Sequence, residues 1–170
     1  MEYNDIRHKI RSGDIIAFSH GSWKSWSSIK TNLVRIFTRS TYSHVGVAWL
    51  AANRIFILEA VKPKIRIFPL SLLGDFYLIS TNATWLPETE EYALSNIGVK
   101  YSELQAVEAF FNPLKSGSIQ ECAAYVREVM LKDGMDLGNM SRPDHIVLTA
   151  LEKYHCNMVY VNNEINVEIE

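Results

Sequence analysis

Thr41-Tyr-Ser-His-Val-Gly-Val-Ala-Trp49 is the stretch that decides the fold of this chain. Its residues are aromatic, small or β-branched, and they alternate with the period of two that a β-strand requires. The large apolar face comprises Val45, Val47 and Trp49, and the small face comprises His44, Gly46 and Ala48. Because small residues admit a close neighbour, we expect a helix to pack on the small face and to hold His44 rigidly near the strand end. The alternative is a core histidine bonded to a backbone carbonyl.

The segments around this strand predict an α+β architecture. Apolar runs on either side of it indicate an antiparallel meander, and the second half of the chain changes to helical spacing. Strands are predicted at 15–19, 54–61, 64–68, 75–80 and 158–161. Helices are predicted at 4–11, 29–37, 87–97, 102–111, 118–132 and 142–153. No repeat or linker interrupts the chain, so residues 1–170 are predicted to form a single domain.

The composition of the 170-residue chain limits the classes of protein to consider. Hydrophobic residues make up 48% and charged residues 21%, which is typical of a soluble globular domain that can bury a core. The formal net charge of −2 gives no electrostatic reason to expect a nucleic-acid partner. No apolar run approaches the roughly 20 residues of a membrane span, so no integral membrane segment is predicted.

The N-terminus and the cysteines predict a reducing location. Met1–Asp5 is acidic and polar, unlike a secretory signal. Cys122 and Cys156 belong to no Cys-x-x-Cys motif, and we expect both to be free thiols. Cys156 lies in Tyr154–Asn157, which we interpret as a surface turn. The expected location is the cytoplasm or another reducing compartment, including that of a host cell expressing a phage or viral protein.

Glu59 offers His44 a partner on the next predicted strand. If an even-numbered loop joins the two strands, positions 44 and 59 share a face and lie opposite or one diagonal step apart. An odd-numbered loop would place them on opposite faces. Glu59 stands inside an apolar run, where a buried carboxylate needs a partner such as an imidazole N–H. The alternative is an edge-strand glutamate that faces solvent.

Cys122 supplies a thiol at the predicted start of a helix. Ser118 and Glu121 have capping-box spacing, which places Cys122 in the first helical turn. There the helix dipole favours a thiolate, and backbone N–H groups can bind an oxyanion. A buried structural cysteine would show the same pattern. What favours chemistry is the combination of this thiol with an imidazole and a carboxylate, the parts of a nucleophile, a general base and an orienting acid.

Four short segments follow one another in a characteristic order. They are Ser12–Ile16, Ser43–Val47, Phe56–Ala60 and Glu121–Val126. This order resembles the circularly permuted branch of the NlpC-like, papain-fold cysteine hydrolases, in particular YiiX-like proteins, with lecithin:retinol acyltransferase-like enzymes as relatives. Papain has its cysteine before its histidine, and the permuted branch reverses them, as here. Gly98–Tyr101 is similar to the glycine–tyrosine segment of that family.

The resemblance implies a permuted papain-like fold, an antiparallel sheet or barrel packed against helices that include the nucleophile helix. It implies Cys122 as nucleophile, His44 as base and Glu59 as third polar residue. Ala123 departs from the pattern, since relatives often carry a serine there. The family includes peptidoglycan peptidases, amidases and lipid acyltransferases. The expected partners are therefore small-molecule, lipid or peptide substrates, including peptidoglycan, and no cofactor or metal is expected.

Three functions remain open on these residues. The first is a thiol-dependent hydrolase, an amidase, peptidase or acyl hydrolase or transferase, that works through a Cys122–His44–Glu59 triad and a thioester. The second is an inactive papain-fold module that binds a peptide or lipid in the same cleft. The third is a metal-dependent hydrolase with His44 and Glu59 as ligands. The distance between the thiol and the imidazole discriminates between the first and the second.

Overall fold

The computed structural model describes residues 1–19, 42–100 and 121–163. Six strands form one sheet in the order β4-β3-β2-β1-β5-β6, and every neighbouring pair is antiparallel. The strands are β1 (Ile15–Ser19), β2 (Tyr42–Ala51), β3 (Arg54–Val61), β4 (Lys64–Pro69), β5 (Phe76–Ser80) and β6 (Asn157–Val161). The chain is thus an α+β protein whose sheet is antiparallel, as the sequence predicted.

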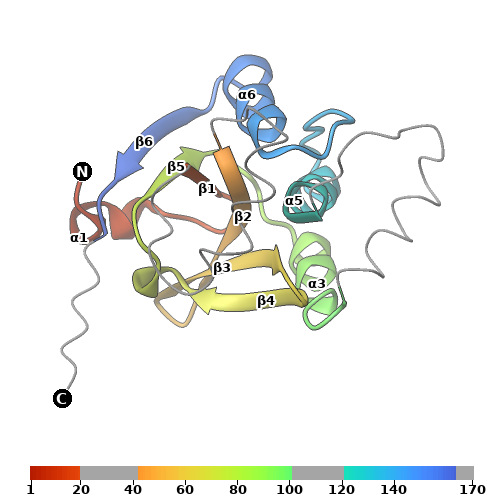
Figure 1. The fold of residues 1–170 in the computed structure, drawn as a ribbon, viewed down its shortest axis with the longest axis horizontal. Helices are drawn as coiled ribbons and strands as arrows, with labels where there is room; N and C mark the ends of the chain where they lie inside the picture. The colour runs from red at the N-terminus through yellow and green to blue at the C-terminus, as the bar shows by residue number, and fades with distance from the viewer. Residues whose placement is uncertain (20–41, 101–120, 164–170) are drawn as a thin grey trace.

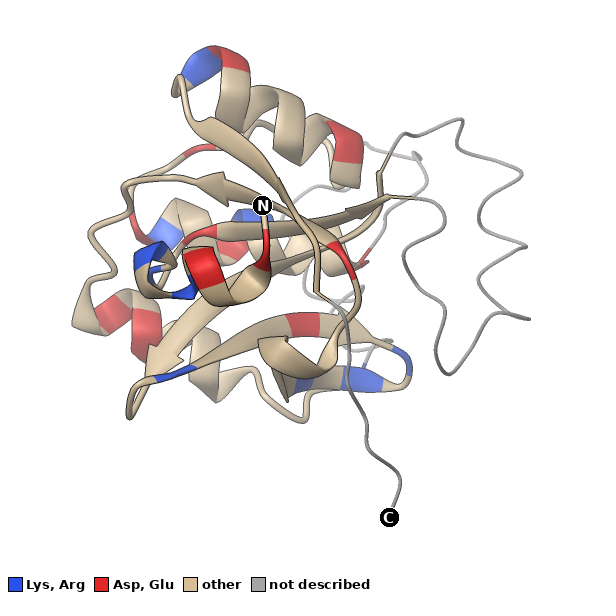
Figure 2. Cartoon of the chain, turned by 90° about the vertical axis from the view of Figure 1, so that its left-hand side faces the viewer, with Lys and Arg blue, Asp and Glu red and all other residues tan. Residues whose placement is uncertain are grey.

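Helices cover both faces of the curved sheet (Figure 1). On one side lie α3 (Pro87–Ser95), α5 (Glu121–Lys132) and α6 (Pro143–Lys153). On the other side lie α1 (Tyr3–Ile6) and the 3₁₀ helices η1 (Arg7–Lys9) and η2 (Leu70–Leu72). None of the helices in the described ranges is long and apolar enough to cross a membrane. On the α1 side, acidic and basic residues are interspersed along the chain (Figure 2).

A two-residue turn fixes the register of the β2–β3 hairpin. Ala52 and Asn53 have φ values of 47° and 61°, and Ala51 pairs with Arg54 on either side of them. Two successive positive φ values are typical of a type I′ turn, whose twist matches that of paired strands. The ladder continues to Val47 opposite Leu58, and one further step places Glu59 opposite Gly46. The loop is therefore even-numbered, which was the condition for His44 and Glu59 to share a face.

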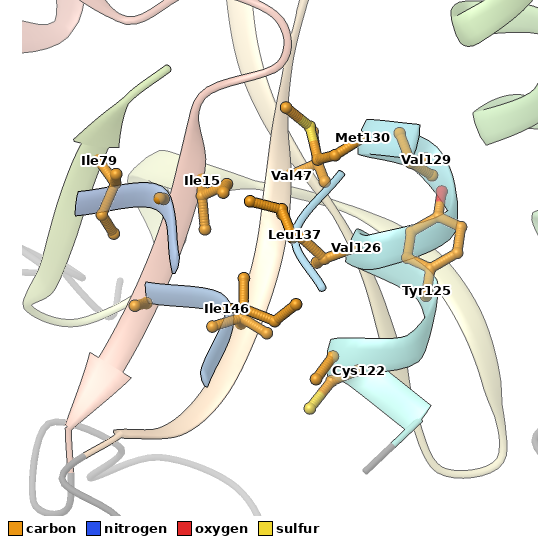
Figure 3. Close-up of a cluster of buried hydrophobic side chains, with 14 of the residues drawn as sticks. Ile15, Val47, Ile79, Cys122, Tyr125, Val126, Val129, Met130, Leu137 and Ile146 are labelled. Atoms are coloured by element: carbon orange, nitrogen blue, oxygen red, sulfur yellow. The ribbon is translucent and has the colours of Figure 1, made fainter. Parts of the chain in front are cut away.

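The helices α5 and α6 pack on the face of β2 opposite to the one that we predicted, while α1 and η2 lie on the side of Ala48. Val45 and Val47 belong to the apolar cluster shared with α5 and α6, part of which Figure 3 shows. Gly46 serves a different neighbour, since a Cβ atom at Gly46 would lie 2.6 Å from the side chain of Ile57 on β3. The small residue thus admits a cross-strand side chain and not a helix. An alternating pattern shows which residues share a face, and long-range packing decides what covers it.

Two apolar clusters hold the sheet between its helical layers. The larger lies under α3, α5 and α6, and the smaller lies under α1 and η2. The smaller cluster includes Phe18, Ala48, Ile57 and Phe76, all buried. Each large apolar side chain that is fully buried stabilises the fold by about 1.5–3 kcal/mol. The predicted helices at 29–37 and 102–111 and the capping residue Ser118 lie outside the described residues.

Candidate active site

His44 lies near the start of β2, where the β1–β2 register shifts between Phe18 and Ser19. The imidazole is buried, and its ring centroid lies 5.8 Å from that of Phe18, the residue paired with it on β1. Its Nε2 atom lies 2.6 Å from Oε2 of Glu59. An ionised carboxylate can only accept hydrogen bonds, so Nε2–H is the donor in this pair. The bond fixes the orientation and the tautomer of the ring.

Glu59 is fully buried, with 0% of its surface exposed. Its two oxygens have different partners: Oε2 accepts from His44, and Oε1 accepts from Arg66 Nε at 2.9 Å and Nη2 at 2.7 Å. Arg66 stands directly opposite Glu59 in the β3–β4 ladder. The alternative of a solvent-facing glutamate is therefore wrong. The buried negative charge is compensated on both sides, as burial of a carboxylate requires.

Cys122 reaches the same imidazole from the helical layer. It is the second described residue of α5, and 4% of its surface is exposed. Figure 3 shows it at one end of the helix, one turn below Val126 in the apolar cluster. Its side chain lies beside the imidazole of His44, close enough to raise the pKa of that ring. The structure thus brings together Cys122, His44 and Glu59, which lie far apart in the sequence on α5, β2 and β3.

The three side chains set the charge of the site. Burial by itself lowers the pKa of His44, but Cys122 and Glu59 outweigh it and raise that pKa from its ordinary 6.5 to about 10. Burial opposes ionisation of Glu59, but His44 and Arg66 together hold the pKa of its carboxyl below the ordinary value of 4.5. Near neutral pH the pair is therefore an imidazolium and a carboxylate.

Arg66 is the site residue that sequence reasoning missed. The signal was present in Lys64–Phe68, which was predicted as a strand next to 54–61. Counting back from the Lys62–Pro63 turn places position 66 opposite position 59. Opposite charges directly across an antiparallel pair attract each other. In the sequence pattern alone, Arg66 is one polar member of an alternating strand.

The prediction that Cys156 lies at the surface is wrong. Cys156 was expected at the surface of a turn, but only 8% of its surface is exposed, and it belongs to the same apolar cluster as Cys122. Its backbone N–H donates to Ala150 O in α6, which draws the turn onto the core. Burial raises the pKa of the Cys156 thiol, and the nearby Asp14 raises it further. Both cysteines are unpaired.

Comparisons with known proteins identify a likeness of fold. No family model matches the chain, and no curated protein matches it. The structure is similar to a solved structure described as metalloprotein yiiX from Escherichia coli O157:H7, DUF1105. The TM-score is 0.51 at 20% sequence identity, and the match covers 91% of this chain and 89% of that chain. At this identity the likeness shows the fold alone.

The description of that neighbour as a metalloprotein prompts a test of the residues present here. His44 Nε2 and Glu59 Oε2 bond directly to each other, and the second carboxylate oxygen is occupied by the cation of Arg66. A metal ion needs several lone pairs that converge on one point, without a competing cation. Within the described ranges, no group of three or more His, Cys, Asp or Glu residues could hold a metal. The site therefore does not fit a metal centre.

Proposed function

We propose that the protein is a thiol-dependent hydrolase or acyltransferase that acts on an amide or ester through a thioester. The observation that carries this proposal is the convergence of Cys122 and Glu59 on the His44 imidazole, with a hydrogen bond of 2.6 Å between His44 and Glu59. A thiol, an imidazole and a buried carboxylate in this order are the parts of a nucleophile, a general base and an orienting acid. The resemblance to permuted papain-fold cysteine hydrolases supports the same reaction class.

The first half of the reaction forms the thioester. His44 holds the proton given up by Cys122, and the sulfur attacks the carbonyl carbon, so that a C–S bond forms and the C=O electron pair moves onto oxygen. Backbone N–H groups at the start of the helix are candidates to bind that oxyanion. The intermediate collapses, the C–N or C–O bond breaks, and the leaving amine or alcohol takes its proton from the His44 imidazolium.

The second half regenerates the enzyme. A water molecule, or an acceptor alcohol or amine in a transferase, gives a proton to His44 and attacks the thioester carbon. The C–S bond breaks, and Cys122 regains the electron pair while His44 retains the proton. Glu59 stays ionised throughout and holds the ring in one tautomer, as the buried carboxylate of a Ser-His-Asp triad does. The substrate is an amide or ester of peptide, peptidoglycan or lipid type.

The experiment that tests this proposal traps the thioester. The protein is incubated with a panel of acyl-amides, acyl esters and peptidoglycan fragments, quenched in acid and mapped by mass spectrometry. The expected result is the mass of one acyl group on the peptide that contains Cys122, together with turnover that C122A abolishes. Turnover that survives in C122A would overturn the proposal.

A non-catalytic binding module is the second candidate, and the burial of Cys122 favours it. A thiol with 4% exposure can be a packed core residue in a fold that has lost its chemistry. The same panel separates the two candidates. Saturable binding that C122A leaves unchanged, with no acyl group on Cys122, would support the module.

A further inference from the structure

We propose that Arg66 is a positioning residue of the site, which holds the Glu59 carboxylate in one orientation and in its ionised form so that His44 stays aligned with Cys122 in mildly acidic solution. The inference rests on the proposed function for its consequence in catalysis. Its physical content, the control of Glu59 by Arg66, is measurable without a substrate.

The hydrogen bonds of Arg66 fix the rotation of the carboxylate. Both Nε and Nη2 donate to Oε1, at 2.9 Å and 2.7 Å, and this leaves Oε2 directed to His44 at 2.6 Å. If Glu59 rotated about its last bond, it would break three hydrogen bonds at once. The guanidinium is planar and presents its donors in a fixed geometry, which the single ammonium of a lysine cannot reproduce.

The charges around Glu59 come from two strands and, indirectly, from one helix. His44 faces it from β2 and Arg66 faces it from β4, while Cys122 on α5 bears on it through His44. These two cations oppose the effect of burial on the carboxyl. Loss of Arg66 would leave a fully buried carboxylate with a single cation, which favours its protonation. A protonated Glu59 no longer attracts the imidazolium.

The surroundings of Arg66 suit a residue that holds another in place. The guanidinium carbon lies 4.6 Å from the centroid of the Phe68 ring, two residues along the same strand. Stacking of this kind restricts the guanidinium to one plane. With 36% of its side chain exposed, Arg66 lies between the buried pair and solvent. It can therefore keep its own charge while it compensates that of Glu59.

The test compares R66M and R66K with wild type, and R54M serves as the matched control. Methionine keeps most of the apolar stem and removes the charge and the donors. Arg54 begins the same hairpin strand as Glu59 and lies outside the site. Glutamate labelled with ¹³C at the carboxyl reports the protonation of Glu59 by NMR. We expect the midpoint of this titration to rise by about one to three pH units in R66M, because an opposite charge is lost. R54M should leave it in place.

Alkylation of Cys122 across the same pH range provides the second reading. In R66M the acid limb of the profile of alkylation rate against pH should shift to higher pH, together with the Glu59 midpoint. R66K should hold the midpoint near that of wild type but lower the rate, since it restores the charge and not the geometry. In an E59Q background, R66M should change the limb little, because Arg66 acts through Glu59.

The outcomes separate this inference from the proposed function. A Glu59 midpoint that stays in place in R66M would overturn the role of Arg66, whatever the protein catalyses. An alkylation rate that falls equally at every pH in R66M would also overturn it, since a merely structural residue has that effect. If the protein turns over no substrate of the panel, the proposed function is contradicted. The Glu59 titration then still tests the role of Arg66.

Discussion

Cys122 and Cys156 are buried to nearly the same extent in one apolar cluster, with 4% and 8% of their surfaces exposed. The difference lies in the charged group beside each thiol. Cys122 lies beside the His44 imidazole, whereas Cys156 lies within the field of the Asp14 carboxylate. A positive neighbour favours a thiolate and a negative neighbour opposes it. Burial alone therefore does not distinguish a candidate nucleophile from a packing cysteine.

The two carboxylates repeat this contrast. Glu59 is flanked by two cations, and the pKa of its carboxyl is lowered in the folded protein. Asp14 accepts hydrogen bonds from the backbone N–H groups of Arg11 and Thr81, but burial prevails and raises the pKa of its carboxyl. The environment of Glu59 thus keeps a carboxylate ionised at the candidate site. The environment of Asp14 uses a carboxylate to connect two loops through backbone hydrogen bonds.

Substitutions around Cys122 should have the largest effect, on turnover. We expect H44A to lower kcat/KM by about 10³-fold or more, because the group that takes the proton is lost. E59Q should lower it by about 10- to 100-fold, because it removes only orientation and charge. C156A should leave it near the wild-type value. Steady-state kinetics on the substrate identified by acyl trapping provides the comparison. Equal turnover of wild type and H44A would rule out the mechanism.

Stability should respond to acid with opposite signs in the two environments. The lowered pKa of Glu59 contributes stability that is present above its unfolded value of 4.5 and lost as pH falls through the folded value. The raised pKa of Asp14 contributes stability that is present below 3.8 and lost as pH rises through the folded value.

Urea unfolding of E59Q and D14N between neutral and acid pH measures this contrast. At neutral pH the free energy of unfolding of wild type should exceed that of E59Q by about 2 kcal/mol, and this difference should shrink on acidification. Over the same range, the free energy of unfolding of wild type should rise relative to that of D14N. Parallel trends for the two variants would contradict the assigned environments.

Thiol alkylation should show a smaller but direct difference. At pH about 6, iodoacetamide should modify Cys122 at least about tenfold faster than Cys156, because only Cys122 has an imidazole to hold its proton. H44A should erase most of this preference in a protein that still folds. Peptide mapping by mass spectrometry measures both rates in one sample. If Cys156 reacts first in the native protein, Cys122 is a core cysteine and the binding-module proposal gains.

The smallest expected effect concerns Asp14 and Cys156. D14N removes the negative charge beside the second thiol, so alkylation of Cys156 should accelerate by less than about tenfold. Cys122, whose charged neighbour is His44, should keep its rate. Mass spectrometry of the two cysteine peptides at a pH near 8 reads both rates. A slower Cys156 in D14N would show that Asp14 does not act on this thiol through its charge.

The sequence predicted more of this fold than of the surroundings of the site. Local alternation was sufficient to locate the strands, such as Arg54–Val61. Apolar residues at helical spacing were sufficient to locate the helix that ends at Lys132. It could not decide whether His44 and Glu59 share a face, because that depends on a turn whose length is ambiguous by one residue. Polar neighbours suggested that Cys156 was exposed, but the docking of α6 buries it. Side-chain environment follows from long-range packing, which no local pattern encodes.

The turn at Ala52 and Asn53 has a consequence for how this gene can change over time. It lies at the far end of the hairpin from His44, yet its length sets the parity that brings His44 and Glu59 to one face. Point substitutions there that accept positive φ, such as glycine at Ala52, leave the parity intact. An insertion or deletion of one codon reverses it, while a two-codon change preserves it. Length variation in this turn should therefore occur in steps of two residues, although neither turn residue belongs to the candidate site.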